Sequence, residues 1–524
     1  MDRILVTEQI AEAGLAALRE HAQVDLRTDL DQVALLALLP EYDALIVRSA
    51  TKVTAEVLAA GTRLRVVGRA GTGVDNIDVT AATARGTLVV NAPAANSVAA
   101  AELAISLICA LSRHIAQADA SMRAGKWERA KFMGSQITGK TLGLVGLGRI
   151  GAEVARRARG LELQVLAYDP VVSTDRAAQI GVTLVSLDDL IAQSDIISVH
   201  VPLLDSTRHL INAERLAQMK PGTFIINAAR GGIVDEAALL AALESGQIGG
   251  AALDVFEVEP PTNSQLIGHP RVVTTPHLGA STVEAQATAG LDVAEGVLTA
   301  LAGGTPSYAV NAPFVPPEEW GVIAPYLKLG RQLGAICTGM VRDPIQSYEF
   351  EYRGELAGVA TAAVRLAVLQ GLLSSLSEQR VTPVNAPLLA RERGLKYSEF
   401  ATEEAESYTG LLVVRAITAE GSHDFAGTVI RDEPNVVEID GYWVSFVPSS
   451  SLLFTYHTDR PGMIGTVGTL LGSADVNISG MFVGRLAPRE KAMMVLTLDD
   501  PVPSHVIEQL EQEPDIHRAV GLTL

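Results

Sequence analysis

The sequence predicts an α/β protein with two doubly wound parallel-sheet lobes, one Rossmann-like and one flavodoxin-like. An α+β segment and a ferredoxin-like βαββαβ segment are expected to follow them. Three observations predict this fold class. Short apolar strands alternate with helical segments over residues 3–280, a glycine-rich turn joins a strand to a helix at 146–151, and the order βαββαβ is indicated over 452–524. Alternation of strands and helices favours parallel sheets covered by crossover helices.

The glycine-rich turn lies between a short apolar strand, 141–145, and a helix predicted over 152–159. One glycine would allow the tight turn, one would let the backbone approach a pyrophosphate, and one would let the helix pack closely on the strand. The free N–H groups of the helix N-terminus favour an anion there. The turn therefore predicts a dinucleotide site. Its glycines are Gly146, Gly148 and Gly151.

A second predicted strand, 164–168, ends at Asp169. This position is about 20 residues beyond the turn, where a ribose-binding acid is expected. A carboxylate there would accept hydrogen bonds from the ribose hydroxyls and repel a 2′-phosphate, which favours NAD over NADP. The alternative is that Asp169 is only a turn residue before Pro170.

Three polar residues follow three successive predicted strands downstream of the glycine turn. The strands are expected at 223–227, 250–255 and 271–275, and the polar residues after them are Arg230, Glu259 and His277. Ligands of open α/β sheets bind at the carboxyl ends of the strands. A guanidinium can hold a carboxylate in a bidentate fork, and an imidazole beside a carboxylate is suited to acid/base work. Each residue alone has an ordinary structural explanation, but the set predicts hydride transfer beside the dinucleotide.

Composition excludes several other classes of protein. The net charge of −19 argues against nucleic acid and anionic membranes as partners. The two cysteines, Cys109 and Cys337, provide neither a disulfide framework nor a metal site. No basic segment followed by an apolar stretch begins the chain, and no apolar run reaches transmembrane length. We therefore expect a cytoplasmic protein without a bound metal.

The segments VGLGRIG, NAARGGIVDE, ALDVFEVEPP and TPHLGAST resemble the D-isomer-specific 2-hydroxyacid dehydrogenases. The resemblance covers roughly residues 3–311. It implies that Arg230 binds the substrate carboxylate, that His277 is the acid/base and that Glu259 is its partner. It also implies that NAD is the cofactor. The contacts that it and the turn imply for the cofactor are Thr72, Gly146, Gly148, Arg149, Ile150, Gly151, Asp169, Ala228, Ala229, Asp254, Gly279 and Ala280.

Two long helices, expected at 97–118 and 281–301, would cross between the lobes and back. The first-lobe segments IVRSAT and GRAGTGVDN are similar to those of phosphoglycerate dehydrogenases. Substrate contacts are therefore expected at Arg48, Ser49, Gly71 and Asn96, facing Arg230 and His277. The predicted domains are 1–96 with 286–312 for the substrate, 97–285 for the dinucleotide, 313–448 as an intervening regulatory or assembly domain, and 449–524 as the last domain.

The last segment resembles the ACT regulatory domain through HTDRPG at 457–462 and DVNIS at 475–479. The resemblance implies amino-acid effector contacts at His457, Asp459 and Asn477, with L-serine as the effector. The alternative is that the Asp459 turn is only a strand–helix connection with Asp as a cap. Side-by-side pairing of such domains implies a homodimer or homotetramer.

The long form of the chain makes phosphoglycerate the expected substrate, because shorter members of the family usually end near the second crossing helix. The expected reaction is the NAD-dependent oxidation of D-3-phosphoglycerate to 3-phosphohydroxypyruvate, which begins L-serine biosynthesis. Two alternatives stay open. One is a glyoxylate or hydroxypyruvate reductase, and the other is a non-enzymatic NAD-sensing scaffold on the same fold.

Overall fold

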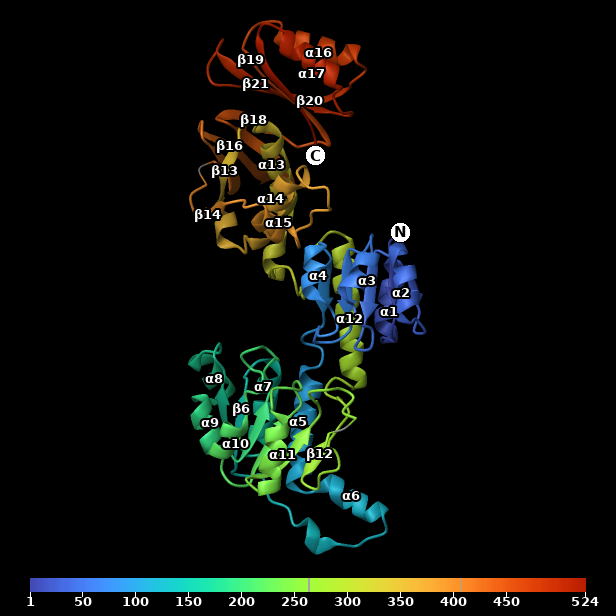
Figure 1. Ribbon diagram of the computed structural model, residues 1–524. Coiled ribbons are helices and arrows are strands. Elements are labelled where there is room, and N and C mark those ends of the chain that lie inside the picture. Colours follow the sequence, from blue (N-terminus) through green and yellow to red (C-terminus); the bar gives the residue numbers. More distant parts are fainter. Residues whose placement is uncertain (263, 406) are drawn as a thin grey trace.

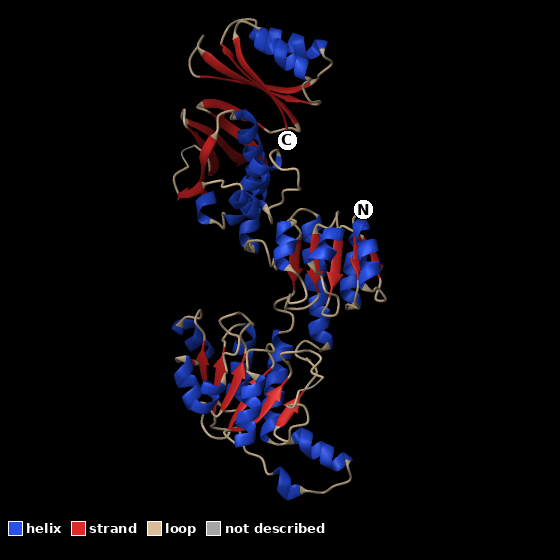
Figure 2. Cartoon of the chain, in the orientation of Figure 1, coloured by secondary structure: helices blue, strands red, loops and turns tan. Residues whose placement is uncertain are grey.

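The computed structural model describes residues 1–262, 264–405 and 407–524. It places two α/β lobes, a mixed sheet with three helices, and a small antiparallel sheet with two helices along the molecule, with the first lobe between the second lobe and the mixed sheet (Figures 1 and 2). The predicted fold class is confirmed.

The first lobe is a five-stranded parallel sheet in the order β2-β1-β3-β4-β5, which is the flavodoxin-like order. Its strands are β1 (Arg3–Val6), β2 (Gln23–Leu26), β3 (Ala44–Val47), β4 (Val66–Arg69) and β5 (Leu88–Asn91). Its helices are α1 (Glu12–His21), α2 (Gln32–Leu38), α3 (Ala55–Ala60) and α4 (Val79–Ala84). From the sequence, strands were expected in this lobe at 3–7, 43–48, 64–68 and 87–90. β2 was missed, because its QVDL sequence has too few apolar residues to signal a buried strand.

The second lobe is a seven-stranded parallel sheet in the order β12-β11-β10-β9-β6-β7-β8. Its strands are β6 (Thr141–Val145), β7 (Gln164–Tyr168), β8 (Thr183–Leu184), β9 (Ile196–Val199), β10 (Thr223–Asn227), β11 (Ile248–Leu253) and β12 (Val272–Thr274). Its helices include α7 (Arg149–Gly160), α8 (Thr174–Ile180), α9 (Leu187–Gln193), α10 (Ala213–Gln218) and α11 (Glu236–Ser245). The strand order reverses between β6 and β9, which places the ligand crevice at their carboxyl ends.

The predicted helix over 97–118 is wrong in its extent, because the chain forms two helices there. α5 (Ser97–Ser112) ends before α6 (Ile115–Arg123), and His114 between them has a φ of 55°. A left-handed residue cannot continue a right-handed helix, so the axis bends by 65°. Within the described residues, no single helix is long and apolar enough to cross a membrane; α5 and α6 pass that test only as a bent pair.

The return crossing is made by α12 (Val283–Leu301). It packs on the first lobe, where Ala289, Val293 and Val297 join the core under β1 and β4. A side chain at Gly14 of α1 would meet the backbone of Gly290, at 2.6 Å from its oxygen, so small residues let α1 and α12 approach closely. α12 begins six residues after His277 and therefore connects that segment to the first lobe.

The intervening segment forms a six-stranded sheet in the order β14-β13-β15-β16-β17-β18, with helices packed on it. Its strands are β13 (Ile345–Gly354), β14 (Tyr397–Thr402), β15 (Gly410–Thr418), β16 (Ser422–Ile430), β17 (Glu433–Ile439) and β18 (Tyr442–Phe446). Its helices are α13 (Trp320–Met340), α14 (Ala362–Ser374) and α15 (Ala386–Glu392).

The last segment is a four-stranded antiparallel sheet in the order β20-β21-β19-β22, the arrangement expected for βαββαβ. Its elements are β19 (Ser451–Thr458), α16 (Met463–Ser473), β20 (Ile478–Arg485), β21 (Lys491–Leu498), α17 (Ser504–Gln512) and β22 (Ile516–Thr523). The two helices cover one face. The other face packs on the intervening segment, with Phe446 6.3 Å from Phe454 and 5.9 Å from Phe482 between ring centroids.

Candidate active site

The glycine turn has the geometry that a dinucleotide requires. Gly146 has a φ of 101°, and a side chain there would lie 2.8 Å from the carbonyl oxygen of His200. A side chain at Gly151 would collide with the carbonyl oxygen of Gly146, so glycine lets α7 pack against the turn. A side chain at Gly148 would meet only open space. That open space borders the first turn of α7, where free N–H groups suit a pyrophosphate, so the residues fit the cofactor.

Asp169 lies beside this turn at the end of β7. One oxygen of its carboxylate accepts from the Leu147 N–H at 2.8 Å, and the other accepts from the N–H groups of Val171 at 2.9 Å and Val172 at 3.1 Å. The carboxylate therefore orients the glycine turn as well as its own loop. A carboxylate has about four lone-pair sites, so it keeps capacity for a hydroxyl donor.

The loop after β10 is held by Asn227, which is 2% exposed. Its Nδ2 donates to the carbonyl oxygen of Arg230 at 2.9 Å, and its Oδ1 accepts from the Ala229 N–H at 3.1 Å. Arg230 in turn donates from Nη1 to the Ala229 carbonyl oxygen at 2.7 Å. The amide of Asn227 thus folds the loop that carries the guanidinium, a role that sequence reasoning did not assign.

Arg230 also contacts the first lobe. Its Nε donates to Oδ2 of Asp75 at 3.2 Å, in an ion pair that joins the two lobes. The guanidinium passes so close to Gly73 that a side chain at that position would collide with Nη2 of Arg230. Asp75 is 70% exposed at its side chain, so the ion pair lies open to solvent on the Asp75 side.

His277 and Glu259 form a pair. Nδ1 of His277 lies 2.8 Å from Oε2 of Glu259, whose Oε1 accepts from the Phe256 N–H at 3.1 Å. The two side chains are 48% and 38% exposed, so the imidazole can reach a substrate while its other nitrogen is held. The contact orients the ring and selects the tautomer with a proton on Nδ1.

Asp254 at the end of β11 holds the segment that carries His277. It is fully buried, and its Oδ1 accepts from Thr275 Oγ1 at 2.6 Å and from the Leu278 N–H at 2.7 Å. Its Oδ2 accepts from the Gly279 N–H at 2.9 Å. His277 itself has a φ of 55°. Non-glycine residues adopt such a conformation only when their surroundings impose it, and these bonds supply that constraint.

Two further acids, Glu236 and Glu257, form hydrogen bonds in the segment that precedes Glu259. The Glu257 N–H donates to Oε1 of Glu236 at 2.5 Å, and Oε1 of Glu257 lies 3.1 Å from Nε2 of His209. Burial raises the pKa of Glu236, and the nearby carboxylates of Glu257 and Glu259 raise it further. The negative charge of these two carboxylates disfavours a further charge on Glu236.

Glu8 organises the loop after β3 in the first lobe. Its carboxylate accepts from the N–H groups of Arg48 at 2.9 Å, Ala50 at 3.0 Å and Thr51 at 2.9 Å. Burial opposes the charge of Glu8, but these donors outweigh it and lower the pKa. Arg48 Nη1 donates to the Gln9 carbonyl oxygen at 3.2 Å, and its guanidinium donates no other hydrogen bond to the residues that the structure describes.

Arg69 ends β4 and was not among the predicted site residues. Its Nε donates to Oδ1 of Asn76 at 2.8 Å, and burial, together with the charge of Arg230, lowers its pKa. A cation under such strain is stabilised by an anion. Its position at the carboxyl end of a parallel strand was the available sequence signal.

Several of the predicted site residues line two cavities. A cavity of 30 Å³ between the lobes is lined by Arg48, Gly71, Thr72, Asn96 and Ala280, among others. The hydroxyl of Thr72 donates to Oδ1 of Asn96 at 2.7 Å beside it.

A separate cavity of 550 Å³ is lined by Asp254, Glu259 and His277, among others. Ser49, in the loop after β3, is exposed and lines neither cavity. Ala228, which precedes Arg230, packs against the core of the second lobe.

The three predicted effector residues do not meet within one chain. β19 and β20 run parallel on either side of β21, so Ser451 and Ile478 both pair with Leu498. Asn477 therefore lies at one end of the sheet, where its Nδ2 donates to Oδ2 of Asp499 at 2.6 Å.

His457 and Asp459 lie at the other end. His457 pairs with Ala492, six residues along β21 from Leu498, which corresponds to about 20 Å. Asp459 accepts from the Arg489 N–H at 3.0 Å and from Arg485 at 3.3 Å. Parallel alignment of the two strands is the reason that a single chain cannot bring the three residues together.

Three segments match known domain families. Residues 105–279 match the NAD binding domain of the D-isomer specific 2-hydroxyacid dehydrogenases, 322–440 the D-3-phosphoglycerate dehydrogenase intervening domain, and 450–515 the ACT domain. The chain is 44% identical to the D-3-phosphoglycerate dehydrogenase of Synechocystis sp., over 100% of this chain and 95% of that protein. The relative from Methanocaldococcus jannaschii is 43% identical, with 100% of both chains covered. The chain belongs to the D-3-phosphoglycerate dehydrogenase family.

Membership in the D-3-phosphoglycerate dehydrogenase family confirms that the chain is a dehydrogenase with an NAD-binding domain. A glyoxylate reductase from Paecilomyes thermophila has a similar structure, with a TM-score of 0.55 and 32% identity, over 61% of this chain and 99% of that chain. That match leaves more than a third of the present chain unaccounted for. The intervening and ACT domains therefore separate this chain from such shorter relatives.

Proposed function

We propose that this protein oxidises D-3-phosphoglycerate to 3-phosphohydroxypyruvate with NAD. The observation that carries the proposal is the match over the whole chain to D-3-phosphoglycerate dehydrogenases, including the intervening and ACT domains. The arrangement of Arg230, Glu259 and His277 at the ends of adjacent strands supports the same reaction.

The proposed chemistry removes two hydrogens from the substrate, one from C2 as a hydride and one from the 2-hydroxyl as a proton. The glycine turn and Asp169 would hold NAD, which would supply the acceptor for the C2 hydride. His277 takes the proton of the 2-hydroxyl on the ring nitrogen that does not contact Glu259, and the electron pair of the broken O–H bond forms the carbonyl. Glu259 holds the ring and stabilises the imidazolium that results. In the reverse direction His277 returns the proton.

Arg230 is proposed to bind the substrate carboxylate, which would replace Asp75 as the partner of the guanidinium. The planar guanidinium can form two parallel bonds to a carboxylate, which a lysine cannot. The substrate phosphate needs a second set of cations. Arg48 and Arg69 of the first lobe are candidates, because both lie near the carboxyl ends of its strands.

The cofactor assignment follows the glycine turn. Gly146, Gly148 and Gly151 would hold the pyrophosphate with Arg149 and Ile150 at the start of α7. Asp169 would bind the ribose, and its charge would disfavour NADP. Asp254 and Gly279, joined by a hydrogen bond of 2.9 Å, would position the loop with Ala280 beside the nicotinamide.

The test is a kinetic comparison of the wild type with His277→Ala. General acid/base catalysis is typically worth about 10²–10⁴-fold, so kcat should fall by that factor while the Kd for NAD changes little. His269→Ala is the matched control, because His269 is an imidazole of the same lobe that bonds the Arg271 N–H. A His277→Ala variant with near wild-type kcat would contradict the mechanism.

A substrate panel separates the alternatives. D-3-phosphoglycerate should give the highest kcat/KM among 2-hydroxy acids, with NAD preferred over NADP. A preference for glyoxylate or hydroxypyruvate would identify a reductase of the shorter kind. Absence of turnover with every 2-hydroxy and 2-keto acid, together with NAD binding, would identify an NAD-sensing scaffold.

The ACT domain is proposed to bind L-serine at a contact between two subunits. β20 is an edge strand, and antiparallel pairing of two such edges would bring Asn477 of one chain to the Arg485 end of the other. Arg485 contacts Asp459, so the effector residues that one chain separates would meet across the pair. Calorimetry should show serine binding that Asn477→Ala abolishes while uninhibited turnover persists. Wild-type protein that binds no serine would refute the regulatory assignment alone.

Besides the proposed pairing of ACT domains, exposed apolar side chains also support a homodimer or homotetramer. The segment of α6 and the residues after it exposes Ile115 (54%), Met122 (54%), Trp127 (76%) and Met133 (83%). Such side chains lose unfavourable contact with water when another subunit covers them. Lys131 lies in the same segment and is proposed as a phosphate contact that reaches across the dimer. Sedimentation equilibrium that shows a monomer at all concentrations would overturn this proposal.

A further inference from the structure

Glu259 belongs to a segment that the hydrophobic core does not hold. Phe256 is 6% exposed and packs in the core of the second lobe, but residues 257–260 after it are all exposed. A loop with few buried contacts opens easily unless hydrogen bonds restrain it. The carboxylate that orients His277 therefore depends on hydrogen bonds to keep its place.

Glu236, the first residue of α11, restrains this segment. Its Oε1 accepts from the Glu257 N–H at 2.5 Å, and its own N–H donates to Oε1 of Glu257 at 3.3 Å. Each of the two carboxylates thus accepts from the main chain of the other residue. Among the described residues, Glu236 is the one acceptor for the Glu257 N–H. The preceding N–H, that of Phe256, donates to Oε1 of Glu259 at 3.1 Å, so the restrained backbone directly adjoins the backbone that holds Glu259.

The same contact brings the loop of Arg230 against the segment. α11 follows that loop and begins six residues after Arg230. A side chain at Gly231 would collide with the carbonyl oxygen of Phe256 and would lie 2.7 Å from the Glu257 nitrogen. The two loops are therefore in direct backbone contact. If the contact between Glu236 and Glu257 were lost, Arg230 and Glu259 could move apart.

A third loop meets the other two at Glu257. His209 lies in the loop after β9, and its Nε2 is 3.1 Å from Oε1 of Glu257. The His209 N–H donates to the Gly232 carbonyl oxygen at 2.7 Å, which ties the same residue to the loop after β10. β9, β10 and β11 are neighbours in the sheet, so these contacts join the loops at three adjacent carboxyl ends.

The position of Glu236 is unfavourable for a charged group. Burial raises the pKa of Glu236, and the carboxylates of Glu257 and Glu259 raise it further. A location that disfavours the ionised form is a poor choice for stability alone. Groups with such perturbed pKa values occur preferentially at functional sites.

We propose that Glu236 is a positioning residue of the hydride-transfer site. Through the Glu257 N–H it keeps the loop of Arg230 and the segment of Glu259 at a fixed separation. It would touch neither substrate nor cofactor. This role rests on the proposed function, which assigns the substrate carboxylate to Arg230 and the proton transfer to His277. An oxygen acceptor at the place of Oε1 is what the role requires, so a glutamine amide oxygen should replace it.

The kinetic test uses variants of the full-length protein. Glu236→Ala removes the acceptor and should lower kcat for D-3-phosphoglycerate by about 10–10²-fold, because small misplacements of reacting groups are that costly. The Kd for NAD should change little, since the glycine turn and Asp169 lie outside these contacts. Glu236→Gln keeps an oxygen acceptor and should retain most of the wild-type kcat.

Two more variants make the comparison specific. Glu236→Asp keeps the charge at the N-terminus of α11 but is one methylene shorter, so it should lose kcat as alanine does, even if the alanine variant folds poorly. Glu244→Ala removes an exposed glutamate of the same helix and should match the wild type. A kcat of Glu236→Asp within about threefold of the wild type would overturn the proposal, because that change is far below the expected loss. A loss in Glu236→Gln as large as that in Glu236→Asp would also overturn it.

Hydrogen exchange measures the restraint without turnover. Peptides that cover residues 254–262 should exchange faster in Glu236→Ala and Glu236→Asp than in the wild type, Glu236→Gln and Glu244→Ala, because the Glu257 N–H loses its acceptor. Exchange of β6, outside these contacts, should be the same in all five proteins and reports an intact fold. Unchanged exchange of the 254–262 segment in Glu236→Asp would overturn the proposal. Faster exchange in a protein whose wild type does not oxidise phosphoglycerate would support the restraint and contradict only the proposed function.

Discussion

Gly73→Ala should impair substrate binding without unfolding the protein. The new methyl group would lie 2.6 Å from Oδ2 of Asp75 and closer still to Nη2 of Arg230. Carbon contacts need about 3.5 Å, so the guanidinium must move by about 1 Å or more. Arg230 is the proposed anchor of the substrate carboxylate. A misplacement of about 1 Å costs about 10²-fold in rate, so kcat/KM should fall by about that factor.

Stability should change little in the same variant. Gly73 does not have a positive φ, so alanine fits its backbone and stabilises by about 0.4–1 kcal/mol through the unfolded chain. The exposed ion pair between Asp75 and Arg230 that the methyl group disturbs is worth about 0.2–1 kcal/mol. These opposing effects nearly cancel, and the atoms that must move are the ends of flexible side chains.

The assay is steady-state oxidation of D-3-phosphoglycerate combined with urea unfolding. Gly358→Ala is the control, since a side chain there would meet open space in the intervening domain. It should leave kcat/KM unchanged and raise the stability only by the amount, about 0.4–1 kcal/mol, that alanine contributes through the unfolded chain. A Gly73→Ala variant with kcat/KM within about threefold of the wild type would refute the placement of Arg230, because that small change is far below the expected loss.

Two further predictions concern groups that hold the site in place. Asp254→Asn should lower the free energy of unfolding by about 1–3 kcal/mol, because its amide nitrogen leaves one of the loop donors without an acceptor, and kcat should fall as His277 loses its position. Unchanged urea unfolding would contradict this. Glu8 has a lowered pKa, so its charge stabilises the fold above the ordinary pKa of a glutamate, and this contribution is lost as the pH falls through the lowered value. Glu8→Gln should therefore be less stable than the wild type at neutral pH, with the difference shrinking near about pH 4, and a pH-independent difference in unfolding midpoint would disprove it.

Much of the architecture could be predicted because it rests on local patterns. The glycine turn, the apolar strands around it and the βαββαβ order each need only neighbouring residues, and all are confirmed. The errors also have local causes. β2 was missed because QVDL is a weakly apolar strand, and the helix over 97–118 was drawn too long because nothing near His114 signals a left-handed residue.

The sequence by itself determined the fold class, the family resemblance and the presence of Arg230, Glu259 and His277, because strand ends and motifs are readable along the chain. Only the tertiary structure decided which groups position them. Asn227 and Asp254 act through hydrogen bonds whose partners depend on loop geometry, and Asp75 reaches Arg230 across 155 residues.

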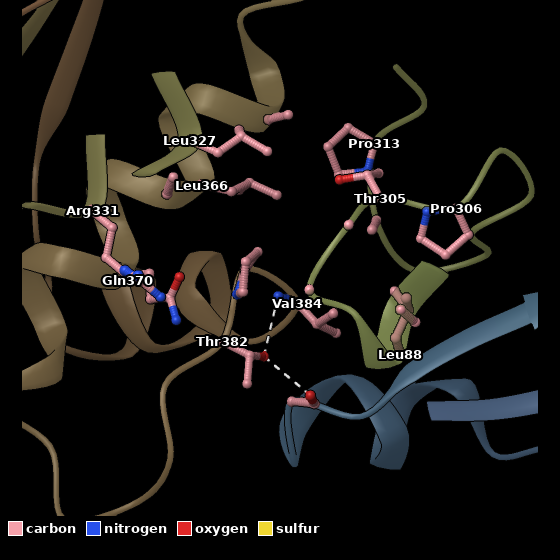
Figure 3. A pocket seen from close by; sticks show the side chains of 18 of the residues that line it. Leu88, Thr305, Pro306, Pro313, Leu327, Arg331, Leu366, Gln370, Thr382 and Val384 are labelled. Atoms are coloured by element: carbon pink, nitrogen blue, oxygen red, sulfur yellow. Dashed lines mark hydrogen bonds between the residues drawn. The ribbon is translucent and has the colours of Figure 1, made fainter. Parts of the chain in front are cut away.

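Tertiary packing also decided two arrangements elsewhere in the chain, one in the ACT domain and one between the first lobe and the intervening domain. Strand order is readable from the sequence, but the parallel alignment that separates Asn477 from His457 is set by pairing with β21. Four cations, Arg65, Lys328, Arg331 and Arg380, line one cavity between the first lobe and the intervening domain (Figure 3), and nothing along the chain indicates that they meet. Charges distant in sequence interact only once packing has fixed their separation, because their interaction energy depends on the distance between them.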